Sequence, residues 1–239
     1  MVQGACQISA IEPPLVAATS LLAPPWHTRA LVALMLAVAA AGTALGHVAG
    51  PTADVALPVA TTYLPLALVN LGLLLYTCRI GLERSILARV FSQGRYDAPR
   101  VLADLAWGAG VALALIGAEK TLQWLLGLPE SVAAHALLPH TAGQKFAWVL
   151  VAALVGFSEE VVYRGYLQRQ LAALSGWAPF GVVAQALLFG IAHGEQGGGA
   201  VARFAVYALG LGWLAAARKS LLPCVLGHVA VDLMAGLAG

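Results

Sequence analysis

The sequence predicts an all-α integral membrane protein, a polytopic helical bundle of about seven to eight transmembrane helices. The chain has 239 residues, of which 60% are hydrophobic and 10% charged, and its mean hydropathy is +0.83. A soluble globular domain carries about a quarter charged residues. Long apolar stretches recur along the chain, and a helix needs roughly 20 such residues to cross a bilayer. We therefore expect the lipid bilayer to surround most of the molecule.

Seven apolar stretches have lengths that suit a membrane-spanning helix. In chain order they are 30–49, 55–77, 101–118, 146–171, 177–193, 200–217 and 221–238. Pro58 and Pro65 lie in the second stretch, where neighbouring helices can accommodate the kink that a proline causes. The stretch 121–138 is a candidate eighth span. A glycine, a proline and a glutamate interrupt it near its middle, so we expect it to be re-entrant or interfacial.

The chain divides into three parts by composition. Residues 1–29 are expected to form an interfacial or disordered lead-in, 30–140 hold the N-terminal transmembrane helices, and 141–239 form a transmembrane core with unusual polar residues. The loop 79–100 contains five arginines against one glutamate and one aspartate, which predicts a cytoplasmic location. The basic pair Arg218–Lys219 follows after four predicted crossings, an even number, so both basic sites are expected on the same side.

Charge and cysteine content exclude two classes of function. A net charge of only +2 gives no reason to expect a nucleic-acid partner. The three cysteines lie far apart and form no CxxC pattern, so they indicate neither a disulfide scaffold nor a thiolate metal site.

Three charged residues stand within an apolar region. Glu159, Glu160 and Arg164 belong to GFSEEVVYRGYLQRQ, which follows the apolar run FAWVLVAALVGF. An ionisable side chain inside a bilayer costs at least about 2.5 to 3.5 kcal/mol, so it usually faces a cavity and has a function. Glu160 and Arg164 are four residues apart, share a helix face and can neutralise each other. Glu159 points about 100° away on a regular helix, which leaves its carboxylate available for chemistry.

Two histidines and an aspartate follow on later apolar stretches. His193 ends the motif FGIAH, which begins at Phe189, whereas His228 and Asp232 begin and end HVAVD on one helix face. Each of Glu159 and His193 is 17 positions from Gly176, the predicted turn, so an antiparallel hairpin brings them to equal depth. The distance of His228 from the basic pair at 218–219 predicts a similar depth. We therefore expect these residues to meet in one water-filled cavity.

A carboxylate and two imidazoles in a low-dielectric cavity are suited to activating water. The carboxylate and one histidine can take a proton from water while the other histidine stabilises an oxyanion, which fits peptide hydrolysis. Glu159, His193 and His228 are also candidate ligands of a zinc ion with water in the fourth position. The sequence lacks HExxH, in which two metal-binding histidines share a helix face. Spacing leaves both a metal-free and a zinc-dependent site open, and we favour the metal-free one.

Three motifs in order resemble one known family. EEVVYR at 159–164, FGIAH at 189–193 and HVAVD at 228–232 resemble the EExxxR, FxxxH and HxxxN/D motifs of the CPBP family. That family contains CAAX prenyl endopeptidases and bacteriocin-processing or bacteriocin-immunity proteins. The resemblance covers about 146–232, and the earlier part of the chain matches only as generic membrane helices.

The resemblance implies a role for each motif residue. Glu159 and His193 would activate the water, and His228 with Asp232 would line the oxyanion side. Glu160, Arg164 and Phe189 would support the site. Relatives are described both as zinc metalloproteases and as glutamate-type proteases without metal. An asparagine at the position of Asp232 can donate a hydrogen bond to an oxyanion, whereas an ionised aspartate repels it. Asp232 must then be protonated, orient His228 or bind a metal.

The implied substrate is a peptide or protein at the membrane. CAAX prenylation is eukaryotic chemistry, and this compact, alanine-rich chain is typical of a bacterial inner-membrane, multi-pass protein. The expected substrates are therefore a peptide pheromone, a leader peptide or the hydrophobic tail of a sorted protein. Two other functions stay open: a peptide-binding or bacteriocin-immunity protein without activity, and a proton-coupled transporter, since intramembrane Glu and His can relay protons. The absence of an inverted repeat disfavours the transporter.

Overall fold

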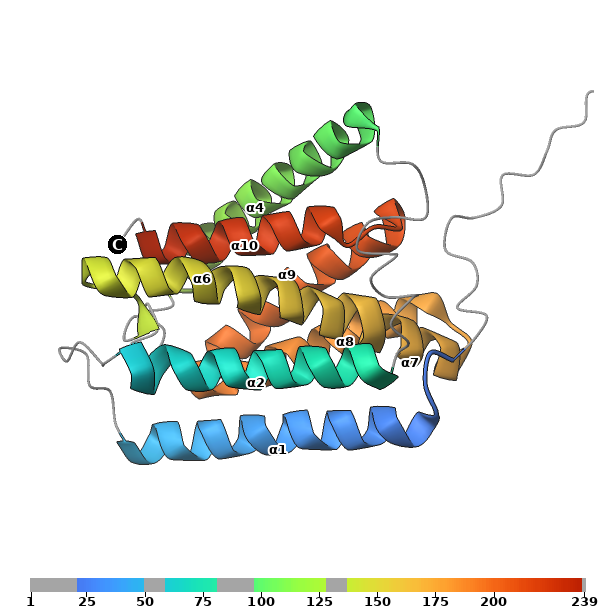
Figure 1. Ribbon diagram of the computed structural model, residues 1–239, viewed down its shortest axis with the longest axis horizontal. Coiled ribbons are helices and arrows are strands. Elements are labelled where there is room, and N and C mark those ends of the chain that lie inside the picture. Colours follow the sequence, from blue (N-terminus) through green and yellow to red (C-terminus); the bar gives the residue numbers. More distant parts are fainter. Residues whose placement is uncertain (1–20, 50–58, 81–96, 128–136, 238–239) are drawn as a thin grey trace, which may run out of the picture.

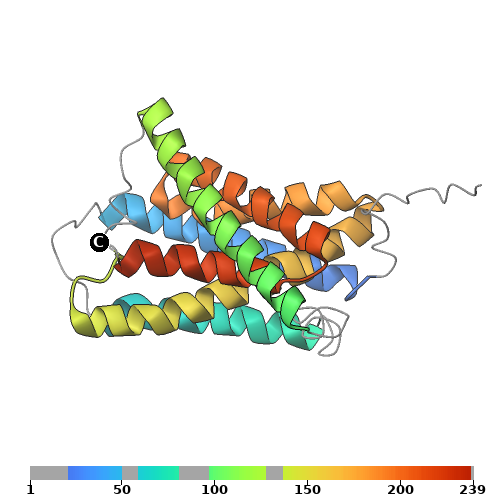
Figure 2. The same cartoon turned by 90° about the horizontal axis from the view of Figure 1, so that it is seen from above.

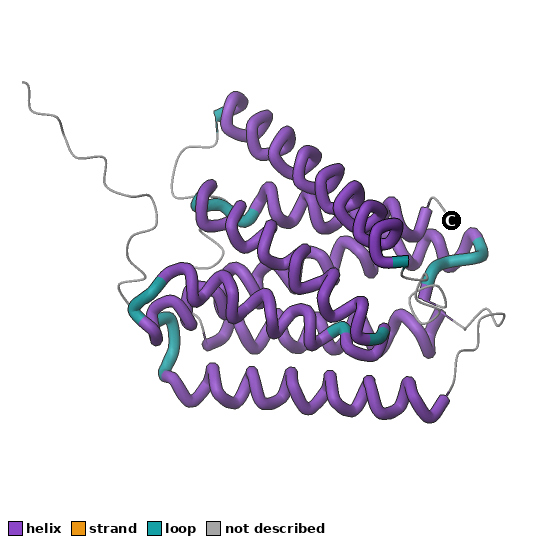
Figure 3. The backbone as a smooth tube through the Cα atoms, turned by 180° about the vertical axis from the view of Figure 1, so that it is seen from behind, coloured by secondary structure: helices purple, strands orange, loops and turns teal. Residues whose placement is uncertain are grey.

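The computed structural model describes residues 21–49, 59–80, 97–127 and 137–237, and this part of the chain is helical with short connections (Figures 1 and 3). The elements are α1 (Pro25–Ala49), α2 (Val59–Ile80), α4 (Ala98–Leu126), α6 (Ala142–Glu159), η1 (Glu160–Leu167), α7 (Gln168–Ser175), α8 (Ala178–Ala192), η2 (Gly194–Gln196), α9 (Gly198–Arg218) and α10 (Leu222–Leu237). The predicted all-α polytopic bundle is confirmed.

Five of the described helical stretches are long and apolar enough to cross a membrane. They are 25–44, 59–80, 98–125, 142–175 and 198–218. Two more apolar helices, α8 and α10, have 15 and 16 residues, so each falls short of a bilayer core of about 30 Å at 1.5 Å per residue. The seven predicted spans thus correspond to seven apolar helical stretches. Of the two short helices, α8 ends directly before His193, and α10 contains His228.

The structure moves two predicted boundaries. The first helix begins at Pro25, five residues before the predicted span, because proline is favoured at the first position of a helix. The predicted separate segment 121–138 is wrong for its first six residues, which continue α4 as far as Leu126. Gly127 ends that helix in the left-handed conformation, with φ 58°, and the remainder up to residue 136 lies outside the described residues. The central part of the basic loop, 81–96, also lies outside them.

The central rod of the bundle runs from Ala142 to Ser175 through α6, η1 and α7. Thr141 begins it with a capping box, in which its side chain accepts from the Gln144 backbone and Gln144 accepts in return. Gly176 ends the rod with φ 70°, and α8 returns from residue 178. The predicted hairpin turn is therefore confirmed, and Glu159 stands near the middle of the rod.

The middle of this rod is a π-helix rather than the regular α-helix that the sequence predicts. η1 covers the eight residues Glu160–Leu167, and all eight are buried. A π-helix is rare and occurs frequently at functional sites. Because every side chain of η1 is buried, packing against the neighbouring helices fixes the wider turn, and no local pattern in the sequence reveals it.

α4 crosses α10 obliquely on one face of the bundle (Figure 2). Gly108 and Gly227 make the crossing close, since a Cβ atom on either would lie 3.0 Å from a carbonyl oxygen of the other helix. Arg218 at the end of α9 binds Asp104 near the start of α4, with Nη2 and Oδ1 2.7 Å apart. The end of α9 and the start of α4 therefore lie at the same end of the bundle. This agrees with the expectation that the basic loop 79–100 and the basic pair 218–219 lie on one side of the membrane.

Candidate active site

A cavity of about 1020 Å³ lies between the helices of the bundle. Apolar side chains of α1 and α2 form much of its wall, and most of the polar side chains come from α6, η1, the end of α8, η2 and α10. Its lining includes Glu159, His193, His228 and Asp232. The convergence predicted from the depths of these residues is confirmed, although their catalytic roles stay predictions.

Behind the cavity wall, Glu160 joins two cationic or basic side chains. Arg164 Nη1 donates to Glu160 Oε1 at 2.9 Å, and His228 Nδ1 lies 2.8 Å from the same oxygen. The side chains of Glu160 and Arg164 have no exposed surface. The predicted pairing of Glu160 with Arg164 is confirmed. The link to His228 attaches η1 to α10, and it joins residues 68 positions apart, beyond the range of any local pattern.

Glu159 and Asp232 flank the other nitrogen of His228. His228 Nε2 lies 3.7 Å from Glu159 Oε2 and 3.7 Å from Asp232 Oδ2, which is longer than a direct hydrogen bond. The Glu159 side chain is 16% exposed and that of Asp232 is 27% exposed, in contrast to the fully buried Glu160. Of the three carboxylates around His228, Glu159 and Asp232 are therefore those that water or a substrate in the cavity can reach.

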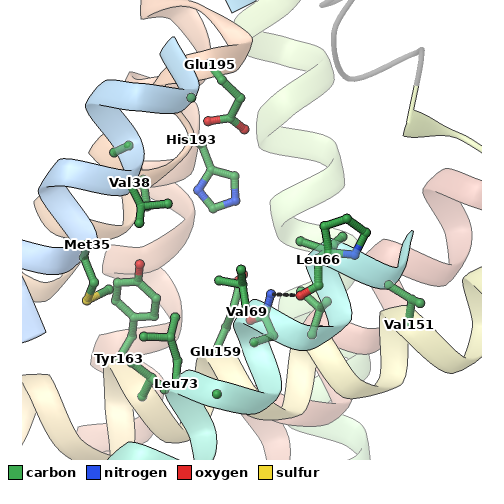
Figure 4. A pocket seen from close by; sticks show the side chains of 18 of the residues that line it. Met35, Val38, Leu66, Val69, Leu73, Val151, Glu159, Tyr163, His193 and Glu195 are labelled. Atoms are coloured by element: carbon green, nitrogen blue, oxygen red, sulfur yellow. Dashed lines mark hydrogen bonds between the residues drawn. The ribbon is translucent and has the colours of Figure 1, made fainter. Parts of the chain in front are cut away.

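His193 faces Glu159 across the cavity. Figure 4 shows His193 entering from one side, beside Glu195, and Glu159 entering from the other side with Tyr163. His193 Nδ1 lies 2.8 Å from the backbone oxygen of Phe189, and a carbonyl oxygen can only accept. Nδ1 therefore carries the proton, and Nε2 of the neutral ring is left as a hydrogen-bond acceptor.

Phe189 lies behind both histidines and has no exposed surface. Its ring centroid is 4.7 Å from that of His193 and 6.0 Å from that of His228, and the Arg164 guanidinium carbon lies 4.8 Å above it. An arginine over an aromatic face makes a favourable cation–π contact. Phe189 thus connects the side chains of all three motifs, which gives a physical reason for the supporting role predicted for it.

The placement of Glu159, His193 and His228 does not fit a zinc ion. Among the residues that the structure describes, no three His, Cys, Asp or Glu side chains are grouped so that they could hold a metal ion. The chemistry of the site is therefore derived from its own side chains.

Three polar side chains near the site had not been predicted. Tyr163 lies between Glu160 and Arg164 in the first motif and lines the cavity, as does Glu195 from η2. Trp148 Nε1 donates to the backbone oxygen of Asp232 at 2.9 Å and so attaches α6 to α10. A polar residue beside a charged motif is the signal that could have identified Tyr163. Trp148 gave no signal, because tryptophan is common in apolar helices.

The fold and the cavity define a class: a multi-pass helical membrane protein with a cavity in its bundle lined by carboxylate and histidine side chains. Residues 141–234 match the family model described as Rce1-like, type II CAAX prenyl endopeptidase. The match spans α6 to α10 and contains all seven predicted site residues, so the resemblance to the CAAX proteases of the CPBP family is confirmed. Comparison with curated proteins and with solved structures gave no match.

Proposed function

We propose that this protein is an intramembrane endopeptidase that hydrolyses a peptide bond of a membrane-associated peptide or protein tail. The observation that carries the proposal is the convergence of Glu159, His193 and His228 on one cavity. The walls from α1 and α2 are largely apolar and suit an apolar peptide segment. In such a low-dielectric site a positioned carboxylate and imidazole act strongly on a bound water and a carbonyl group.

In the proposed reaction Glu159 is the general base. Its carboxylate takes a proton from a water molecule, and the water oxygen attacks the carbonyl carbon of the peptide. The electron pair of the C=O double bond moves to the oxygen, which becomes an oxyanion. When the C–N bond breaks, Glu159 returns the proton to the leaving nitrogen, so the products are a carboxylic acid and an amine. His193, with Nε2 as an acceptor on the opposite side, helps to hold the water.

Asp232 and the buried pair position His228 in this proposal. Glu160 holds His228 Nδ1, and Asp232 approaches Nε2 from the same helix. An ionised Asp232 beside His228 Nε2 would repel an oxyanion that formed at that nitrogen. We therefore assign to Asp232 the orientation of His228 and not the stabilisation of the intermediate.

The proposed location is a bacterial cytoplasmic membrane, in which the substrate is a pheromone, a leader peptide or a hydrophobic tail. The compact, alanine-rich chain supports this proposal. The family description supports a substrate with a CAAX-like apolar end. A peptide that enters from the membrane between the apolar helices would agree with both the proposed location and the proposed substrate.

The decisive experiment compares the wild type with Glu159→Gln in detergent or in liposomes. The probes are farnesylated CAAX-type and unmodified leader-type peptides that carry a fluorophore and a quencher. A general base contributes about 10² to 10⁴ in rate, so kcat should fall by that factor while thermal unfolding is unchanged. Glu119→Gln, at a half-exposed carboxylate on α4, is the matched control and should retain full activity. Equal cleavage by the wild type and Glu159→Gln would contradict the proposal.

Two further results would redirect the assignment. Binding of these peptides without cleavage would support a peptide-binding or immunity protein, and substrate flux in proteoliposomes without cleavage would support a transporter.

Metal dependence is tested on the same purified protein. With a base supplied by Glu159, activity should survive prolonged treatment with a strong chelator, and elemental analysis should find well below one zinc per chain. Loss of cleavage on chelation, with recovery on adding stoichiometric zinc, would reassign Glu159 to a partner of a metal-bound water.

A further inference from the structure

The cavity has a shortage of hydrogen-bond donors. Glu159 and Asp232 are acceptors when ionised, and His193 Nε2 is an acceptor in the tautomer fixed by Phe189. His228 uses Nδ1 toward Glu160, and its Nε2 lies between two carboxyl groups. An oxyanion needs a donor aimed at it, and these groups supply none that is uncommitted.

Other polar side chains on the cavity wall take part in hydrogen bonds within the protein. Asn70 Nδ2 donates to the Leu66 backbone oxygen, and Trp148 Nε1 donates to that of Asp232. The Tyr76 hydroxyl pairs with His27 at 2.9 Å. Each of these groups has a partner within the protein and contributes to helix packing.

Tyr163 is the exception. Its side chain is 5% exposed, its ring packs edge-on against Phe189 at 4.9 Å, and its hydroxyl makes no hydrogen bond within the described part of the chain. Figure 4 shows the ring rising from η1 with its oxygen pointing into the cavity, toward Val38 and His193. The hydroxyl is therefore open to a ligand or water in the cavity and has no partner among the described residues that such a group would have to displace.

We propose that Tyr163 is a further catalytic residue, whose hydroxyl donates a hydrogen bond to the carbonyl oxygen of the scissile peptide bond and to the oxyanion formed from it. This inference rests on the proposed peptidase function. Tyr163 transfers no proton, so the hydrolysis is balanced by water and Glu159 as before. Tyr163 and Glu159 leave the same rod four residues apart and reach the same cavity, one as the proposed donor and the other as the proposed base.

The first test is Tyr163→Phe, measured with the quenched peptides that the wild type cleaves. Loss of one oxyanion donor lowers kcat by about 10² to 10³, so kcat should fall by at least about 10² with KM changed little. Tyr166→Phe is the control: Tyr166 lies on the same π-helix with its hydroxyl bonded to Thr28 at 3.0 Å, and it does not line the cavity. A raised KM with unchanged kcat would overturn the donor role and indicate only substrate packing.

A second test reports on the hydrogen bond itself. The scissile carbonyl oxygen, located by mass spectrometry of the products, is replaced by sulfur, a weak acceptor. The ratio of kcat for the oxygen peptide to that for the sulfur peptide should be smaller in Tyr163→Phe than in the wild type. Equal ratios would overturn the inference. If the phenylalanine variant fails to fold, 3,5-difluorotyrosine at position 163 keeps the shape and strengthens the donor, and an unchanged kcat would overturn the inference.

The outcomes separate the two proposals. If the wild type cleaves, Glu159→Gln does not, and Tyr163→Phe retains full kcat, the peptidase function stands and the role of Tyr163 falls. If Glu159→Gln cleaves like the wild type, the proposed function falls and the role of Tyr163 falls with it.

Discussion

The central rod 142–175 and the N-terminal helices are equally apolar but differ in how they are buried. In the most apolar part of the rod 44% of the residues are buried, whereas the corresponding shares are 22% in α1, 12% in α2 and 17% in α4. Mean hydropathy is similar, at 1.6 for both the rod and α2. Hydropathy therefore identifies which helices cross the membrane, whereas burial separates the helices that hold the site from those that form its lipid-facing wall.

Two charged pairs, one from each region, differ in the same way. Glu160 and Arg164 form a fully buried pair on the rod, 2.9 Å apart. Glu119 on α4 is 46% exposed and lies 3.6 Å from Arg203 of α9. A buried pair that loses one partner leaves a charge without compensation, whereas an exposed pair contributes little.

The largest expected effect follows from this contrast. Arg164→Ala should lower the free energy of unfolding by about 3 to 5 kcal/mol, because it leaves the Glu160 carboxylate buried and unpaired. Glu119→Ala, the matched control, should change it by less than about 1 kcal/mol. Unfolding in mixed detergent micelles measures both. Similar stability losses for the two variants would break the distinction between buried and lipid-facing regions.

A smaller effect is expected at the helix contacts. A Cβ atom on Gly156 would lie 2.7 Å from Val229 Cγ2 and 3.2 Å from Val229 N, so Gly156→Ala should push α6 and α10 apart and cost about 1 to 3 kcal/mol. Gly117 of α4 has no atom within 4 Å of the same position. Gly117→Ala should be neutral or stabilise by up to about 1 kcal/mol. Thermal unfolding of both variants checks the contrast, and a destabilised Gly117→Ala would show that α4 packs more tightly than described.

The smallest effect concerns the cavity wall contributed by α1. Val38 and Leu36 are both exposed, but only Val38 lines the cavity. Val38→Trp should raise KM for a bulky apolar peptide about tenfold, since contacts in an apolar pocket contribute about 1 to 3 kcal/mol. Leu36→Trp should leave both kcat and KM unchanged. If Val38→Trp also leaves KM unchanged, the substrate does not occupy the side of the cavity lined by α1.

Several features of this molecule were predictable because they depend on local rules. Backbone groups in lipid must be satisfied within the helix, so apolar runs predict the helices. The spacing of Glu160 and Arg164 predicts their contact, and Gly176 predicts the turn that brings Glu159 and His193 to one cavity. The boundaries were less accurate: the sequence placed the end of α4 too early, because a long helix with charged residues near its end gives no clear stop before Gly127.

By itself, then, the sequence determined the apolar helices, the depth of the polar residues and the family to which its motifs point. Only the tertiary structure decided the π-helix at Glu160–Leu167, the bond from His228 to Glu160 and the position of the Tyr163 hydroxyl in the cavity. The physical reason is that depth follows from counting residues along a helix, whereas the rotation of each helix about its axis depends on packing against distant segments. No local period in the sequence encodes that rotation, and the rotation selects which side chains reach the cavity.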